Sequence, residues 1–206
     1  MASKKLVEVW DGLNLNKDNI IFLKKKTTDV RLPYSPEIKQ ILQDLLDTYQ
    51  KIPCAGIAAN QIGYSKRIFI GLKYDDEKET KEDNAQLDIN SNSNADNYEF
   101  YINPRIQHSS PKSLQEGEEG CLSIPEIRLI AERYDKIKVR YFNRDGKKVQ
   151  KPLSGFMSRL FQHELDHLNG LLMVENSQIK SVYKISDNNQ LDSLYSDLLK
   201  QILEVK

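Results

Sequence analysis

The chain has 206 residues, and its 30 basic and 30 acidic side chains leave no formal net charge at pH 7. This length suits one domain, and the charge balance does not indicate nucleic acid or an anionic membrane as a partner. No apolar run approaches the roughly 20 residues that span a bilayer, and the first residues lack the apolar core of a secretory signal, so we expect a soluble protein. Its two cysteines, Cys54 and Cys121, argue against a disulfide scaffold and for a reducing compartment.

The first half of the chain predicts one amphipathic helix and two strands. Residues 35–50 carry apolar side chains on one stripe of a 3.6-residue period, with Ser35 as a candidate N-cap, which predicts a helix. Short apolar runs at 68–72 and at 98–106 predict strands. The helix and the first strand are separated by small residues, which suggest close approach of the backbone to another group.

A strongly acidic segment interrupts this half. Residues 74–98 hold eight acidic side chains and two lysines, and the segment has too few apolar residues to fill a core. We therefore expect a single domain over residues 1–206 that carries a polar, mobile insertion at 74–98.

The second half predicts a β-hairpin and two helices. Between residues 136 and 153, two alternating segments flank an Asp-Gly turn, which predicts a hairpin. The segment 154–170 has helical periodicity, with Ser154 as a candidate cap and Gly170 as a stop signal. Apolar residues at helical spacing predict a further amphipathic helix in the tail at 187–206. This order of elements indicates an α+β fold with mostly antiparallel strand pairing.

Two of the three histidines lie in the segment FQHELDHLNG. His163 and His167 are four residues apart, so a helix places both imidazoles on one face, where they can bind the same metal ion. A single histidine on such an apolar face is more often a hydrogen-bonded core residue. The pair with Glu164 between them is a more restrictive pattern, and it predicts metal ligation.

A catalytic metal normally has three protein ligands and an open position for water, so a third ligand is required. The position that metzincins use holds Met173, and Glu175 follows His167 too closely to match the downstream glutamate of thermolysin-type peptidases. His108 lies in a polar segment that we expect to form a turn. The remaining candidate is Cys121 in EEGCLSIPE, although a lone cysteine is commonly a buried structural thiol.

Three blocks occur in order along the chain: GIAANQIG at 56–63, EGCLS at 119–123 and QHELDH at 162–167. Together they closely resemble the three motifs of peptide deformylases. The resemblance implies an enzyme that removes the formyl group from formyl-methionine at the N-terminus of nascent chains. It also implies one divalent metal ion, with Fe(II) as the native metal and zinc, nickel or cobalt as substitutes.

The resemblance further implies antiparallel β-sheets packed around a central, metal-binding HExxH helix, with amphipathic helices on its N-terminal and C-terminal sides. The implied metal ligands are Cys121, His163 and His167. Glu164 would take a proton from the attacking water and deliver it to the leaving amine. The side-chain amide of Gln61 and the backbone N–H of Leu122 would stabilise negative charge on the formyl oxygen.

The same resemblance implies how a peptide substrate binds. Backbone groups would pair with the peptide as with an added strand. These groups belong to Ala55, Gly56 and Gly120. Phe156 and Leu160 are candidates for the methionine pocket, with plain core packing as the alternative, and Arg128 occupies a position near the substrate. Cys54 stands where the family usually has glycine, and its side chain would narrow the groove or offer a second thiol near the metal.

Two other functions stay open at this point. One is a zinc endopeptidase that uses the same helix with a third ligand other than Cys121. The other is a catalytically inactive, deformylase-like binding protein for ribosomes or nascent chains, against which the presence of every chemically active residue argues. The expected partners are formyl-methionyl peptides and the ribosome, with no nucleic-acid or membrane site and a monomer as the default. Formylated initiation implies the bacterial cytoplasm or an organelle of bacterial origin.

Overall fold

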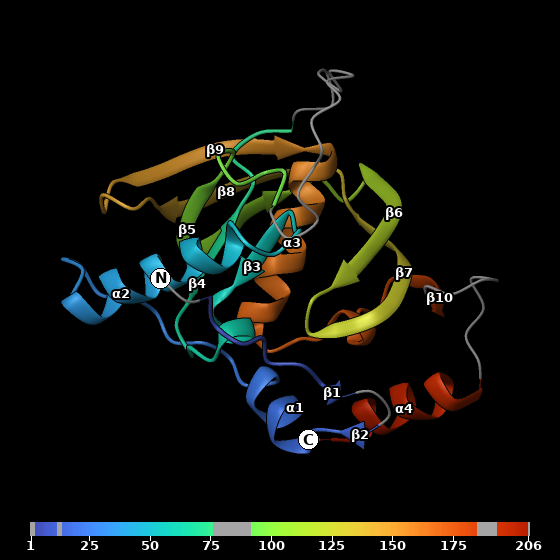
Figure 1. Cartoon of the computed structure of the whole chain (residues 1–206). Helices are drawn as coiled ribbons and strands as arrows, with labels where there is room; N and C mark the ends of the chain where they lie inside the picture. The colour runs from blue at the N-terminus through green and yellow to red at the C-terminus, as the bar shows by residue number, and fades with distance from the viewer. Residues whose placement is uncertain (1–2, 12–13, 76–91, 185–192, 206) are drawn as a thin grey trace, which may run out of the picture.

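The computed structural model describes residues 3–11, 14–75, 92–184 and 193–205. Within them, the helix α3 (Gly155–Asn169) lies between two antiparallel sheets, near the middle of the molecule (Figure 1). The predicted α+β class with antiparallel pairing is confirmed. In the part of the chain that the structure describes, no helix has the length and apolar character needed to cross a membrane.

The larger sheet has five strands, each antiparallel to its neighbours. In spatial order they are β3 (Gly56–Ala58), β4 (Ile68–Gly71), β5 (Glu99–Ser109), β8 (Lys136–Phe142) and β9 (Lys148–Ser154). Strands β8 and β9 form the predicted hairpin, with Ile137, Val139 and Tyr141 buried. The prediction of a turn at His108 is wrong, because β5 continues through this residue and pairs it with Lys138 of β8.

The smaller sheet has β7 (Ile124–Tyr134) at its centre, with β6 (Leu114–Cys121) and β10 (Ile179–Lys184) on its two sides. Strands β6 and β7 form a hairpin whose connection is Leu122 and Ser123. The pairing register shifts at the end of β6, so that Cys121 lies opposite Ile124. Cys121 therefore lies at the end of this hairpin.

The helix α2 (Pro36–Tyr49) covers one side of the larger sheet. Its start is capped by Ser35, whose Oγ accepts a hydrogen bond from the backbone N–H of Ile38 at 3.3 Å. Its buried face includes Ile41 and Leu45, which belong to the same apolar cluster as Ile70 of β4. Burial of this stripe follows from the periodicity that predicted the helix.

Five further elements pack on the smaller sheet. They are β1 (Trp10–Asp11), β2 (Asn14–Leu15), α1 (Lys17–Leu23), the short helical turn η2 (Met173–Glu175) and α4 (Ser193–Glu204). Leu198 and Ile202 of α4 share an apolar cluster with Leu129 of β7. Residues 187–192 of the predicted C-terminal helix lie outside the described residues.

The two ends of α3 differ in how well the sequence predicted them. Ser154 occupies the N-cap position, but its side chain makes no capping hydrogen bond; instead the backbone N–H of Gly155 donates to Oδ1 of Asp135 at 3.1 Å. Gly170 ends the helix with φ of 78°, a left-handed conformation that favours glycine. A Cβ on Gly170 would also lie 2.3 Å from the carbonyl oxygen of Lys24.

Both ends of the acidic insertion are attached to the body of the protein, while its residues 76–91 lie outside those described. Asn92, which is buried, donates from Nδ2 to the carbonyl oxygen of Cys54 at 3.0 Å. Asn97, also buried, donates to the carbonyl oxygen of Tyr74 at 2.9 Å. The chain therefore leaves and rejoins the fold at two hydrogen-bonded points.

Candidate metal centre and active site

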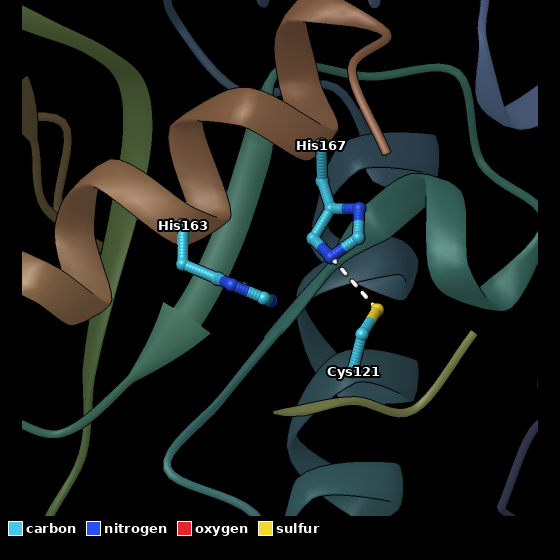
Figure 2. Close-up of side chains that lie close together, drawn as sticks. All are labelled: Cys121, His163 and His167. Atoms are coloured by element: carbon cyan, nitrogen blue, oxygen red, sulfur yellow. Dashed lines mark hydrogen bonds between the residues drawn. The ribbon is translucent and has the colours of Figure 1, made fainter. Parts of the chain in front are cut away.

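The three predicted ligands lie together between α3 and the β6–β7 hairpin. His163 and His167 extend from successive turns of α3 toward Cys121 at the end of β6 (Figure 2). Their donor atoms all lie within 4.8 Å of one another, and Cys121 Sγ is 3.2 Å from Nε2 of His167. The three residues therefore form a group that can hold a metal ion.

The orientation of His163 is set by Glu119 of β6. Nδ1 of His163 lies 2.9 Å from Oε2 of Glu119, so Nε2 is the ring nitrogen left to face a metal, as is common for ligating histidines. Glu119 is itself held by two arginines. Arg133 donates to it at 2.8 and 2.9 Å, and Arg159 donates to it at 3.0 Å.

These contacts keep Glu119 ionised. Burial alone raises the pKa of Glu119, but the hydrogen bonds and charges of Arg133 and His163 hold that pKa well below its usual range. Arg133 also donates to Oδ2 of Asp166 on α3 at 2.5 Å. A buried network of charges thus joins β6, β7 and α3 directly behind His163.

The surroundings of Cys121, the predicted cysteine ligand, favour its thiolate form. Burial alone raises the pKa of Cys121, but the adjacent His167 and His163 lower it to about 5. Burial lowers the pKa of His163, and the hydrogen bonds to Cys121 and Glu119 outweigh it, so that this pKa is raised. A thiolate is the form of cysteine that binds metals. One thiolate with two imidazoles fits a divalent transition metal such as iron or zinc.

The short helical turn η1 (Ala59–Ile62) carries Gln61 to the centre. Asn60 of this turn donates to the carbonyl oxygen of His167 at 2.7 Å, which ties η1 to α3. The side-chain oxygen of Gln61 accepts a backbone N–H at the start of the turn at 2.8 Å. This bond fixes the amide so that Nε2 points to Cys121 Sγ at 3.5 Å. A donor N–H therefore lies beside the three ligands.

Glu164 faces the same space with a free carboxylate oxygen. The residue is 3% exposed, and its Oε2 has no hydrogen-bond partner among the described residues. Burial raises the pKa of Glu164 to about 7, so this group can accept and release a proton near neutral pH. The absence of a side chain at Gly56 leaves room for the carboxylate of Glu164, since a Cβ on Gly56 would lie 2.8 Å from Oε1 of Glu164.

A pocket of about 490 Å³ opens beside these groups. Of the predicted site residues, those that line it are Ala55, Gly56, Gln61, Gly120, Cys121, Leu122, Arg128, Phe156, Leu160, His163 and Glu164. His167 lies deeper, at 1% exposure. Phe156 is 38% exposed and Leu160 is buried, so core packing explains Leu160 in part and does not explain Phe156. Cys54 lines the pocket as well, and burial raises its pKa to about 12.

Sequence reasoning missed residues that support the centre from behind. They are Glu119, Arg133 and Arg159, together with Ser123, whose Oγ accepts from Gln61 at 3.3 Å. The position of Glu119 could have been inferred from the sequence. Residues two apart on a strand share a face, and Glu119 precedes Cys121 by two. No sequence pattern links the two arginines to Glu119, because Arg133 and Arg159 lie 14 and 40 positions from it.

Three metal donors, a free carboxylate with a pKa near neutrality and an adjacent pocket define the centre of a metal-dependent hydrolase. The family model for polypeptide deformylase matches residues 13–183. The chain belongs to this family.

Individual relatives agree with the family model. A peptide deformylase of Thermus thermophilus is 37% identical over 139 residues, which are 67% of this chain and 69% of the relative. One of Thermotoga neapolitana is 34% identical over 142 residues, 69% of this chain and 73% of the relative. Among solved structures, the Met-Ala-Ser-bound class I type b peptide deformylase of Acinetobacter baumannii matches with a TM-score of 0.63 at 28% identity, covering 84% of this chain and 98% of the other.

Proposed function

We propose that this chain hydrolyses the formyl group from the N-terminal formyl-methionine of nascent polypeptides and releases formate. This proposal is supported chiefly by the buried Cys121–His163–His167 cluster, which lies beside an oxygen of Glu164 that has no hydrogen-bond partner among the described residues. The A. baumannii relative was solved with Met-Ala-Ser, which is the peptide that deformylation of formyl-Met-Ala-Ser leaves behind.

Cys121, His163 and His167 would hold one divalent ion, with Fe(II) as the native metal and zinc, nickel or cobalt as substitutes. The lowered pKa of Cys121 and the fixed ring of His163 support this assignment, since the donor set suits both iron and zinc. When bound, the ion supplies Lewis acidity, which lowers the pKa of water and polarises the formyl carbonyl.

Glu164 moves the proton. Its Oε2, which has no partner among the described residues, accepts a proton from the water that attacks the formyl carbon. The same oxygen then delivers that proton to the amine nitrogen, which becomes the new N-terminus of the methionine. A pKa of about 7 suits both transfers.

Gln61 and Leu122 stabilise the developing oxyanion. Oε1 of Gln61 accepts a hydrogen bond from the backbone N–H of Ala58, which holds the amide in place and directs Nε2 toward Cys121. The backbone N–H of Leu122, at the tip of the β6–β7 hairpin, would be the second donor. Removal of one such donor typically costs about a hundred- to a thousandfold in rate.

The substrate peptide would lie along the pocket. Backbone groups of Ala55, Gly56 and Gly120 would pair with it as with an added strand. Backbone pairing does not depend on the side chains of the peptide beyond the first residue, so specificity is determined by the methionine side chain. Phe156 and Leu160 would contact the methionine side chain, and Arg128 would contact the chain further along, near Glu118, which it approaches to 3.6 Å.

The setting of the activity follows from its substrate. We place it in one domain over residues 1–206, acting as a monomer on chains that emerge from the ribosome, in the bacterial cytoplasm or an organelle of bacterial origin. The bacterial sources of the relatives support this setting.

Anaerobic turnover of formyl-Met-Ala-Ser tests the proposal. Wild type loaded with Fe(II) or Ni(II) is expected to release formate, and Glu164→Gln, which keeps the shape of the side chain, is expected to lose about a thousandfold in rate. The metal content of the variant should stay unchanged. Glu116→Gln, a change to an exposed glutamate of β6, serves as the matched control and should keep full activity.

Two results would contradict the proposal. Metal-loaded wild type that binds the peptide without releasing formate would indicate the inactive binding protein. Cleavage of internal peptide bonds, measured by mass spectrometry of the products, would indicate an endopeptidase.

A further inference from the structure

Residues 6–9 form a short segment that we call the N-terminal strap, and it lies across two parts of the candidate active site. The backbone N–H of Val7 donates to the carbonyl oxygen of Gln61 at 2.8 Å. The backbone N–H of Val9 donates to the carbonyl oxygen of Ser123 at 2.9 Å. Gln61 belongs to η1, and Ser123 lies in the connection between β6 and β7. The strap therefore joins the two segments that carry the proposed oxyanion donors.

The side chains of the strap alternate between two sides. Leu6 and Glu8 line the pocket, whereas Val7 and Val9 pack with the apolar cluster of the smaller sheet. This alternation is typical of an extended chain, in which equivalent groups of residues two apart point the same way and lie about 6–7 Å from each other. The strap therefore sets the spacing of the two carbonyl groups that it binds.

Other hydrogen bonds fix the strap to the body of the protein. Just before it, the backbone N–H of Lys4 donates to Oγ1 of Thr48 on α2 at 3.1 Å. Within it, the carbonyl oxygen of Glu8 accepts from Nδ2 of Asn19 on α1 at 2.8 Å. The strap is thus held by α1 and α2 as well as by the two segments that it joins.

A hydrogen bond between side chains closes a ring with the strap. Nε2 of Gln61 donates to Oγ of Ser123 at 3.3 Å. The two residues are therefore linked once through their side chains and once through the strap. Leu122, whose backbone N–H would be the second oxyanion donor, directly precedes Ser123. The positions of both donors thus depend on the same ring of hydrogen bonds.

We propose that the N-terminal strap is a positioning element that fixes the backbone of Gln61 relative to that of Leu122, so that both donors meet the formyl oxygen. The inference rests on the proposed function, because it assumes that these two groups stabilise that oxygen in the transition state. Such donors are effective when they are aligned in advance with the developing charge, and a small misplacement of a group lowers the rate strongly. The backbone N–H of Val7 is the contact that the proposal makes decisive for Gln61.

Loss of the bond between Val7 and Gln61 should affect kcat and leave the metal and the bound peptide unchanged. The three metal ligands belong to α3 and β6, which the Val7 bond does not involve. Negative charge appears on the formyl oxygen only as water attacks, so the donors matter most in the transition state. The product Met-Ala-Ser has no formyl oxygen. Its affinity therefore reports on the pocket wall, which includes Leu6 and Glu8, separately from the donors.

Steady-state kinetics of the metal-loaded enzyme with formyl-Met-Ala-Ser test this. Val7→Pro removes the N–H that binds Gln61 and keeps an apolar side chain. We expect kcat to fall about tenfold, the size of one lost hydrogen bond. This is less than the hundred- to thousandfold typical of a missing donor, because Gln61 itself is retained. Metal content, KM and the Kd of Met-Ala-Ser, measured by calorimetry, should match wild type.

Replacement of the Val7 amide by an ester is the second variant, and it decides the matter if Val7→Pro does not fold. Incorporation of the hydroxy acid that corresponds to valine removes the same N–H and keeps the side chain, so kcat should fall by a similar factor. Lys5→Pro is the matched control, because it introduces the same ring at an exposed residue just before the strap. Its kcat should match wild type.

Three results would overturn the inference. They are an equal fall in kcat in Lys5→Pro, a loss of metal or a weaker affinity for Met-Ala-Ser that accounts for the fall, and a fall in Val7→Pro that the ester variant does not share. Absence of formate release by wild type would overturn the proposed function and this inference together. Normal turnover by wild type with unchanged kcat in both Val7 variants would overturn this inference alone.

Discussion

The helix α3 meets the two sheets in different ways. Toward the five-stranded sheet it presents apolar side chains, which belong to one buried cluster with β4, β5, β8 and β9. These side chains are Met157, Leu160, Phe161, Leu165 and Leu168. The ring of Phe161 lies 5.5 Å from that of Phe69 and 5.7 Å from that of Tyr101, both at steep angles.

Toward the three-stranded sheet the same helix presents charged and amide side chains. Arg159 and Asp166 join the network of Glu119 and Arg133. Gln162 exchanges hydrogen bonds with the backbone of Tyr134, donating to its carbonyl oxygen at 2.8 Å and accepting from its N–H at 3.1 Å. Each of these contacts is a hydrogen bond with a donor and an acceptor.

The contrast separates two tasks. Apolar burial has no preferred direction and scales with area, so the larger sheet determines where the helix lies. Hydrogen bonds between charged groups depend on distance and angle, so the smaller sheet determines how His163 is turned and which charge surrounds it. Changes on the two sides should therefore affect different measurable properties.

The largest effect is expected on the charged side. Arg133→Met leaves Glu119 buried with one arginine in place of two and removes the bond to Asp166. Breaking a buried ion pair from one side costs about 3–5 kcal/mol. Metal affinity should fall by about 10- to 100-fold, because Glu119, the partner of His163, is then held less firmly. Urea unfolding and metal competition measure both quantities.

The exposed pair of Arg105 and Asp29 provides the control for Arg133→Met. Arg105→Met should change the free energy of unfolding by no more than about 1 kcal/mol and leave metal affinity unchanged. If both variants lose equal stability, or if Arg133→Met binds metal like wild type, the charged network does not orient His163.

The next largest effect is expected in the reactivity of the two cysteines. Cys54 packs against the apolar cluster of α2 and the larger sheet, while Cys121 ends β6. Their pKa values of about 12 and about 5 make Cys54 a thiol and Cys121 a thiolate at pH 7. In metal-free protein, iodoacetamide should alkylate Cys121 about a hundredfold faster, after allowance for the lower nucleophilicity of an acidic thiolate.

The two alkylation rates should differ in how they change with pH. The rate at Cys54 should rise about tenfold per pH unit between pH 7 and 9, since the thiolate fraction grows below its pKa. The rate at Cys121 should stay constant over that range and fall to nearly zero when zinc is added. Peptide mass spectrometry follows both sites, and equal rates would contradict the assigned pKa values.

The smallest effect is expected on the apolar side. Phe161→Leu removes the aromatic contacts and some volume from a fully buried site, which should cost about 1–2 kcal/mol in the free energy of unfolding. Because this cluster consists of apolar side chains and includes none of Cys121, His163 and His167, metal affinity of the folded variant should match wild type. A fall in affinity comparable to that of Arg133→Met would remove the distinction between the two sides.

The same contrast explains which parts of the molecule the sequence could predict. The periodicity of α2 and the alternation of β8 and β9 arise from apolar faces, and local pattern is enough to detect them. The spacing of His163 and His167 is also local. Cys121 was reached by elimination and by the order of the three blocks, and the structure brings it to the two histidines.

The charged side was harder to predict because it has no apolar pattern. Strand β6 consists largely of glutamates and glycines, and its residues alternate between more and less exposed positions. Because it carries almost no apolar residue, the sequence indicated a role only for its last residues. The partners of Glu119 lie far away in the sequence, and the sequence does not show whether an arginine is buried or exposed. Tertiary pairing of this kind has no signature in a single chain.

The attachment of the acidic insertion bears on how sequence length can vary in this protein. Asn92 donates to the carbonyl oxygens of Tyr49 and Cys54, and Asn97 donates to that of Tyr74, so the last part of the insertion holds the pocket wall at Cys54. The entropy of closing a loop grows only with the logarithm of its length, about 0.6 kcal/mol per doubling. Residues can therefore be gained or lost between Tyr74 and Asn92 during evolution while the geometry of the pocket wall is preserved.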